Sequence, residues 1–143
     1  MYIIQYVNVF FWLLFFFNSE LISGRWDLVE FTAIESIRNS DGYLLADFET
    51  QALADQKFQL ALDSVRYEFK KDTLYYTDIE DVNIVHRRAK WKIIGDTLFV
   101  KEIDRIYLRK YFIRKVSQDS LVFSSIFNGK PARSSYIFSR DEK

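Results

Sequence analysis

The sequence contains no cysteine, one histidine, one proline and four glycines, and each scarcity excludes a class of structure or chemistry. Without cysteine, the chain forms no disulfide bridge and lacks the acceptor for bacterial lipoprotein modification, so cysteine usage does not identify the compartment. A single histidine cannot supply the several imidazole or thiolate ligands that zinc and haem sites normally use. Proline and glycine are too few for a disordered linker, and the sequence contains no internal repeat of fixed period.

Charge of one sign does not dominate either, because 20 basic and 20 acidic side chains cancel. We therefore expect no long-range field that would recruit nucleic acid or an anionic membrane. Once a leader is set aside, about 120 residues remain, which is enough for one domain with a core and too few for two. The predicted organisation is a leader at residues 1–23 and a single domain at residues 24–143.

The leader is predicted from the first 19 residues, which carry no charged side chain. Their apolar block, Val9 to Phe17, has the length of the hydrophobic region of a signal peptide. We expect cleavage between Ser19 and Gly24 and export to the periplasm, the outer surface or the medium. An uncleaved membrane anchor and a buried terminal element are the alternatives; a helix over residues 2–17 would be about 24 Å long, somewhat short of a roughly 30 Å hydrocarbon core.

Alternation of apolar and polar residues predicts a chain made mainly of short β-strands. In the segment from Ile84 to Ile94, Ala89, Trp91 and Ile93 fall on one face and basic residues fall on the other, which is typical of a half-buried antiparallel strand. Short polar turns such as Gly95-Asp96 separate the segments. The predicted strands are residues 25–34, 65–70, 73–79, 84–94, 97–103, 106–116, 120–127 and 134–140.

One helix is expected near residues 44–62. Leu45, Phe48, Ala52 and Leu62 recur there at about helical spacing, with no glycine or proline in the segment.

Eight sequential strands joined by tight turns would expose two edges and one whole face if they formed an open meander. Closure into a barrel removes both problems. The predicted fold class is therefore mainly β, an eight-stranded antiparallel up-and-down barrel with one helix between the first two strands, packed at its side or over its mouth. The interior of such a barrel is either filled by side chains or holds one small ligand.

Several short motifs together resemble the lipocalin-like domain proteins of Gram-negative bacteria. The motifs are Gly24-x-Trp26, Trp91-Lys-Ile-Ile-Gly-Asp-Thr-Leu98, the segment 111–121 and the terminal Tyr136-Ile-Phe-Ser-Arg140. The resemblance spans roughly residues 24–140 and implies a small exported β-barrel; many members of the group have no established activity. The segment 41–63 is longer than a simple first loop, and the disulfides of many secreted lipocalins have no counterpart here.

The same resemblance implies a role in structural closure for Gly24, Trp26 and Arg140. In lipocalins the tryptophan of Gly-x-Trp closes one end of the barrel, and an arginine from the end of the last strand lies across its ring. Neither Trp26 nor Arg140 is then expected to contact a ligand.

Catalytic chemistry has little support in this sequence, and we predict that the protein is not an enzyme. His86 falls on the polar face of its strand, where a Ser-His-acid arrangement would have to be built on an exposed surface. Asp78, Glu80 and Asp81 could bind a hard cation but lack the spacing of a calcium loop, so we expect a solvated loop there. We expect no metal and no cofactor, while paired carboxylates for glycoside chemistry stay open because only a structure gives their separation.

Two basic segments are the parts of the sequence that macromolecular partners could contact. Period-two alternation explains the first, Arg88, Lys90 and Lys92, as a solvent face. The second comprises Arg105, Arg109, Lys110, Arg114 and Lys115, interleaved with tyrosines. We interpret it as a solvated face, with an acidic protein partner as the alternative; export and balanced charge argue against nucleic acid.

The candidate interior of the barrel determines the function. The residues on the apolar phases of their strands are Tyr67, Phe69, Ala89, Trp91, Val100, Phe123, Tyr136 and Phe138. They form either a filled core or the lining of a ligand cavity, in which tyrosine hydroxyls would orient a polar head group.

The leading functional hypothesis is an exported protein that binds a small apolar or amphipathic molecule, such as a lipid, without covalent chemistry. The alternative is a protein-interaction module, an inhibitor or accessory subunit, with a filled barrel and contacts in its loops. Membrane contact is expected only through an uncleaved leader. The sequence does not specify the ligand, the oligomeric state or the physiological process.

Overall fold

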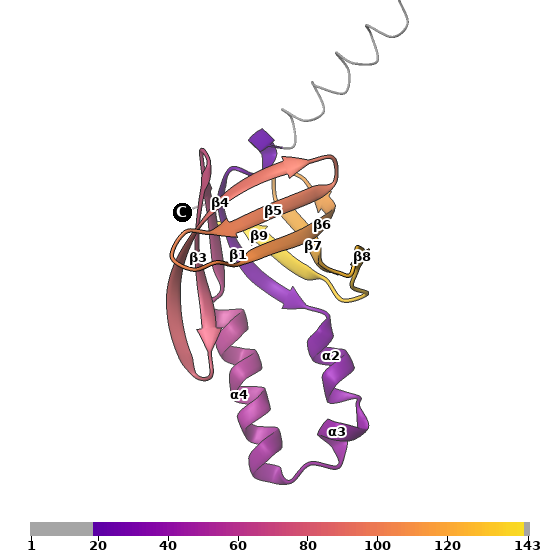
Figure 1. Cartoon of the computed structure of the whole chain (residues 1–143). Coiled ribbons are helices and arrows are strands. Elements are labelled where there is room, and N and C mark those ends of the chain that lie inside the picture. The colour runs from indigo at the N-terminus through magenta and orange to yellow at the C-terminus, as the bar shows by residue number, and fades with distance from the viewer. Residues whose placement is uncertain (1–18, 142–143) are drawn as a thin grey trace, which may run out of the picture.

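The computed structural model describes residues 19–141, which form a closed β-barrel with a helical arm attached (Figure 1). Eight antiparallel strands form the barrel: β1 to β7 follow in chain order, β6 pairs with β7, and β9 lies between β7 and β1. The predicted fold class is confirmed. The elements are β1 (Gly24–Phe31), α2 (Ala33–Arg38), α3 (Asp41–Leu44), α4 (Phe48–Ser64), β2 (Arg66–Lys70), β3 (Thr73–Glu80), β4 (Asn83–Ile94), β5 (Thr97–Glu102), β6 (Leu108–Val116), β7 (Ser120–Phe127), β8 (Lys130–Pro131) and β9 (Tyr136–Arg140).

The strands follow from the alternation in the sequence. In β4, Ala89 and Ile93 are buried while Lys90 and Lys92 are exposed, as the period of two requires. The β4–β5 turn contains Gly95 at φ 61°, a left-handed conformation that glycine adopts without steric cost. The strand boundaries are thus set by local turn chemistry at one end of the barrel.

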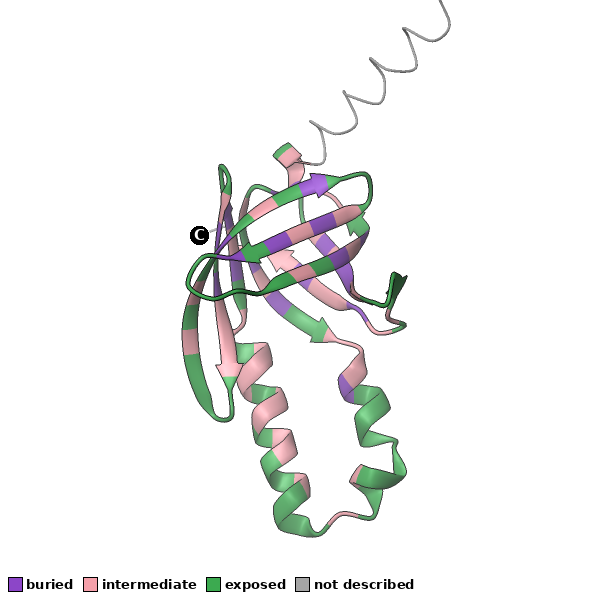
Figure 2. Cartoon of the chain, in the orientation of Figure 1, coloured by how far each residue is buried: buried purple, intermediate pink, exposed green. Residues whose placement is uncertain are grey.

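The side chains that the barrel strands bury form one apolar cluster, and Figure 2 shows buried residues alternating with more exposed ones along these strands. Aromatic rings pack at its centre: the ring centroids of Phe123 and Phe138 lie 5.2 Å apart, and that of Tyr67 lies 5.1 Å from Phe138. The most deeply buried large side chains are Trp26, Phe69, Phe123, Phe138, Ile22, Leu74, Leu98, Leu121 and Val100. Removal of this surface from water is the main stabilising term of the fold.

The arm comprises α2, α3 and α4 and projects from the barrel between β1 and β2 (Figure 1). Asp47 caps the N-terminus of α4 by accepting a hydrogen bond from the Thr50 amide at 2.7 Å. Only the C-terminal end of α4 joins the core, through the partly buried Leu62. None of the described helices is long and apolar enough to span a membrane.

The arm corrects two sequence predictions. The first strand was predicted to reach Ile34, but it ends at Phe31, and Ile34 lies in α2. The helix predicted near residues 44–62 is α4, which begins after its cap Asp47 and ends at Ser64, and the short helices α2 and α3 that precede it were not predicted. Sequence periodicity alone does not resolve two helices that lie three residues apart.

Candidate functional site: a pocket at the open end of the barrel

One end of the barrel is closed by Trp26. The ring is fully buried, its Nε1 donates a hydrogen bond to the Ile22 carbonyl at 2.7 Å, and the Arg140 guanidinium carbon lies 4.1 Å from the ring centroid. Arg140 also donates a hydrogen bond to the Ser23 carbonyl at 2.7 Å and others to the carbonyls of Leu21 and Gln118. These contacts tie the segment before β1 to the last strand.

Gly24 makes room for that arrangement. Its φ is 115°, and a Cβ placed there would lie 2.6 Å from Nη1 of Arg140. Only glycine combines this backbone conformation with so close an approach. The closed end therefore has no space for a ligand beside the Arg140 guanidinium.

The predicted interior residues divide between the core and the opposite end. Tyr67, Phe69, Ala89, Val100, Phe123 and Phe138 are buried in the core cluster, and Trp91 and Tyr136 are partly buried at its edge. Trp91 packs edge-on against Phe69 at 5.1 Å, and its buried Nε1 has no hydrogen-bond partner among residues 19–141. Of this set, Tyr136 is the residue that lines the pocket described next.

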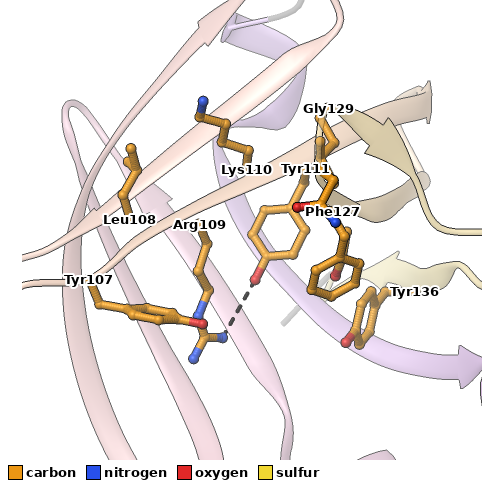
Figure 3. A pocket seen from close by; sticks show the side chains of 11 residues that line it. Tyr107, Leu108, Arg109, Lys110, Tyr111, Phe127, Gly129 and Tyr136 are labelled. Atoms are coloured by element: carbon orange, nitrogen blue, oxygen red, sulfur yellow. Dashed lines mark hydrogen bonds between the residues drawn. The ribbon is translucent and has the colours of Figure 1, made fainter.

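The pocket lies at the open end of the barrel and has a volume of about 570 Å³. It is formed where β6 begins and where β7 ends, with Tyr136 at the start of β9 (Figure 3). Its lining residues are Tyr107, Leu108, Arg109, Lys110, Tyr111, Ser125, Ile126, Phe127, Asn128, Gly129 and Tyr136. A volume of this size accommodates a small organic molecule.

The Arg109 side chain lines the pocket, and its guanidinium is incompletely hydrogen-bonded. Its Nη1 lies 3.5 Å from the Tyr111 hydroxyl, and its Nη2 lies 3.4 Å from Asp78 Oδ2 and 3.9 Å from Glu102 Oε1. All three contacts are long for a guanidinium, whose charge-assisted bonds are normally about 2.7–2.9 Å. Its Nε is buried and has no hydrogen-bond partner in the described part of the chain.

The neighbouring carboxylates are engaged by other cations. Glu102 is buried and accepts hydrogen bonds from Arg105, at 2.5 and 3.1 Å, and from the Tyr76 hydroxyl. Burial acts to raise the pKa of Glu102, but the hydrogen bonds from Arg105 and Tyr76 outweigh it and hold the pKa below its usual value. Asp78 also lies 3.4 Å from Arg87 Nε. Arg109 is thus the cation of this cluster with the weakest pairing.

Aromatic side chains surround the Arg109 guanidinium. The ring of Tyr107 is centred 5.2 Å from its central carbon and that of Tyr76 5.9 Å. Figure 3 shows Tyr111, Phe127 and Tyr136 facing the same space. Burial raises the pKa of Tyr136, so its hydroxyl stays neutral at physiological pH. The pocket combines one cation, neutral hydroxyls and apolar ring faces.

The other candidate sites have simpler explanations. His86 is exposed on β4. Of the acidic cluster at residues 78–81, Asp78 and Glu80 contact Arg87. Within residues 19–141, no group of three or more histidine, cysteine or acidic side chains is arranged to hold a metal ion.

Sequence analysis missed Arg109 as a pocket residue. It was interpreted as part of a solvated basic face, but it lies on the inward face of β6 with Tyr111 and Ile113, both buried. The signal was available, because Arg109, Tyr111 and Ile113 alternate along the strand. Arg114, in the same basic segment, hydrogen-bonds at 2.7 Å to the buried Ser124 hydroxyl.

Comparisons with known proteins support the fold. No family model and no curated protein matches the sequence. The structure is similar to that of an uncharacterized protein from Bacteroides eggerthii, with a TM-score of 0.47, 11% identity, and coverage of 83% of this chain and 98% of that one. It is also similar to the crystal structure of a lipocalin-like protein from Bacteroides uniformis, with a TM-score of 0.53, 13% identity, and coverage of 85% of this chain and 99% of that one. At this identity the likeness shows a shared fold, the lipocalin-like barrel.

Proposed function

We propose that this protein is exported and binds a small amphipathic anion, without covalent chemistry, in the pocket at the open end of its barrel. The observation that carries the proposal is the incomplete pairing of Arg109 inside a pocket of about 570 Å³. A buried donor without an acceptor carries an energetic cost that a ligand carboxylate, sulfonate or phosphate would remove. The lipocalin-like barrel fold is consistent with ligand binding.

The apolar part of the ligand would lie against Tyr107, Phe127 and Tyr136. These rings offer apolar contact area, while the hydroxyls of Tyr111 and Tyr136 can donate hydrogen bonds to the head group. The filled core on the other side limits the ligand to one short chain or one small ring system. These features support the pocket as the site of an amphipathic ligand.

Probe displacement tests the proposal. The anionic dye 1-anilinonaphthalene-8-sulfonate should bind at one site and be displaced by decanoate at least about 10-fold more effectively than by decanol, since a charge-assisted hydrogen bond contributes about 1.5–3 kcal/mol. Arg109→Met should abolish the preference for decanoate. Lys115→Met is the matched control, because Lys115 is an exposed cation farther along the same strand and does not line the pocket. Equal displacement by acid and alcohol, or an unchanged preference in Arg109→Met, would refute the proposal.

A second candidate function, a protein-interaction module, is favoured by the arm. Leu45 and Phe48, at its tip, are 85% and 83% exposed, and every residue of α4 is at least partly exposed. The arm is held together by polar contacts to Asp55, from Arg38 at 3.0 Å and from the Tyr43 hydroxyl at 2.8 Å. If the arm is the functional surface, Arg109→Met should leave the binding of a protein partner in the native host unchanged, while Phe48→Asp should abolish that binding.

A further inference from the structure

The open end of the barrel carries a group of exposed apolar side chains outside the pocket. We refer to Ile103, Ile106, Tyr107, Leu108 and Phe127, each 42% exposed or more, as the rim. Ile106, at the centre of the β5–β6 loop, is fully exposed. Isolated exposed apolar residues are ordinary, but a contiguous group of large ones marks an interaction surface.

The rim is continuous although its residues come from two parts of the chain. Tyr107 and Leu108 line the pocket together with Phe127, and they also line a neighbouring hollow with Ile103 and Ile106. In the β6–β7 ladder Tyr111 lies opposite Ser125, so each strand continues from this pair toward the same end of the barrel. The rim is therefore one surface at the ends of β5, β6 and β7.

Basic side chains surround the rim. Segments 101–110 and 125–133, which lie at this end of the barrel, together contain six lysines and arginines and two acidic residues, Glu102 and Asp104. Both acidic groups are paired, Glu102 with Arg105 and Asp104 with Arg88 at 2.9 Å. By contrast, three lysines near the rim form no ion pair within residues 19–141: Lys101, Lys110 and Lys130. Lys101 pairs across the sheet with Leu108, and Lys130 pairs with Phe127. Lys110 lies on the outer face of β6.

The arm has the opposite character. Its segment, residues 32–64, contains six acidic and two basic residues, although its tip also exposes large apolar side chains. The arm is attached to β1 and β2, which lie across the barrel from β5 and β6, and it leaves β1 at the same open end, where Phe31 pairs with the pocket residue Tyr136. The chain thus has two apolar surfaces with opposite charge.

We infer that the rim docks onto the surface of an anionic lipid bilayer. Ile106 and Phe127 would enter the interfacial region, where apolar and aromatic side chains are favoured, while the surrounding lysines would lie at the depth of the lipid phosphates. The acidic arm would be repelled from the same surface. This inference goes beyond the proposed function and does not depend on a ligand in the pocket.

A fluorophore at the rim tests the inference in the full chain, where an uncleaved leader could by itself hold the protein on vesicles. Because the chain has no cysteine, Ile106→Cys introduces a unique attachment site for the environment-sensitive dye NBD. Addition of vesicles of equimolar phosphatidylcholine and phosphatidylglycerol should shift the NBD emission to the blue, and lipids brominated on their acyl chains should quench it. Vesicles of phosphatidylcholine alone should require at least about 10-fold more lipid for the same response, and added salt should weaken it.

The matched control is Leu45→Cys, which places the dye on the exposed apolar tip of the arm. Its emission should not shift with either vesicle. In the Ile106→Cys background, Lys101→Glu combined with Lys110→Glu should abolish the response, and Lys57→Glu, in the arm, should preserve it. The inference is overturned if the dye at position 106 stays in water, if the arm dye responds equally, or if neutral and anionic vesicles give the same titration. A protein partner for the rim would be the remaining explanation in the first case.

Discussion

Trp26 and Arg140 are expected to be energetically coupled at the closed end of the barrel. Trp26→Ala removes a fully buried ring and should lower the free energy of unfolding by about 3–5 kcal/mol. Arg140→Ala should cost less, about 1–3 kcal/mol, because it loses a cation–π contact of about 0.5–2 kcal/mol together with partly exposed hydrogen bonds.

The coupling arises because the guanidinium has no ring to contact once Trp26 is gone. The double variant should therefore be less destabilised than the sum of the single variants by about 1 kcal/mol. Urea denaturation of the four proteins at pH 7 measures the cycle. Trp26→Phe provides a milder starting point if Trp26→Ala does not fold, and Arg140→Lys keeps the charge without the forked donor geometry. Additivity within about 0.3 kcal/mol in both cycles would refute the stacking contact.

Four further outcomes are expected. Hydrogen bonds lower the pKa of Glu102 despite its burial. The ionised carboxylate therefore stabilises the fold above the pKa of about 4.3 that glutamate has in the unfolded chain, and this contribution is lost as the pH falls through the folded pKa. In denaturation curves, the difference in unfolding free energy between the native protein and Glu102→Gln should shrink below about pH 4. Gly24→Ala should lower the unfolding free energy by about 1–3 kcal/mol, and an unchanged midpoint of urea denaturation would contradict this. Ala89→Trp, at a fully buried site beside Trp91 on β4, should cost at least about 1–3 kcal/mol by overpacking yet leave probe binding at the open end intact. Intact-mass analysis after expression in a bacterial host should find a mature chain starting between Ser19 and Gly24, and a chain retaining the leader would count against cleavage.

The barrel was predictable because its information is local. In β4 every second residue from Val85 to Ile93 is at least partly buried, and turns such as Gly95-Asp96 carry residues suited to reversing the chain. Once eight such strands are recognised, closure follows from the need to satisfy their edges. The predicted leader lies largely outside the described residues, and its cleavage stays a prediction.

The arm and the pocket were not predictable in the same way. The alternation of Trp26 and Leu28 gives no sign that β1 stops at Phe31, because the stop depends on how the chain leaves the barrel. Asp47, a capping residue three positions before Thr50, was a readable signal for the start of α4. Arg109 was obscured by its basic neighbours, and only the sheet register distinguishes it from Lys110.

The overall neutrality of the chain conceals an uneven distribution of its charges. Balanced charge argues against electrostatic recruitment only when the charges are evenly mixed over the surface. Here the arm segment has an excess of four acidic residues, and segments 101–110 and 125–133, which build the rim, have an excess of four basic ones. At physiological ionic strength, charges separated by more than about 8 Å are largely screened from one another, so a bound partner responds to the local patch and not to the sum. The basic rim should therefore recognise an anionic surface, and the acidic arm a cationic one. The pocket that contains Arg109 opens beside the rim, because Tyr107, Leu108 and Phe127 belong to both.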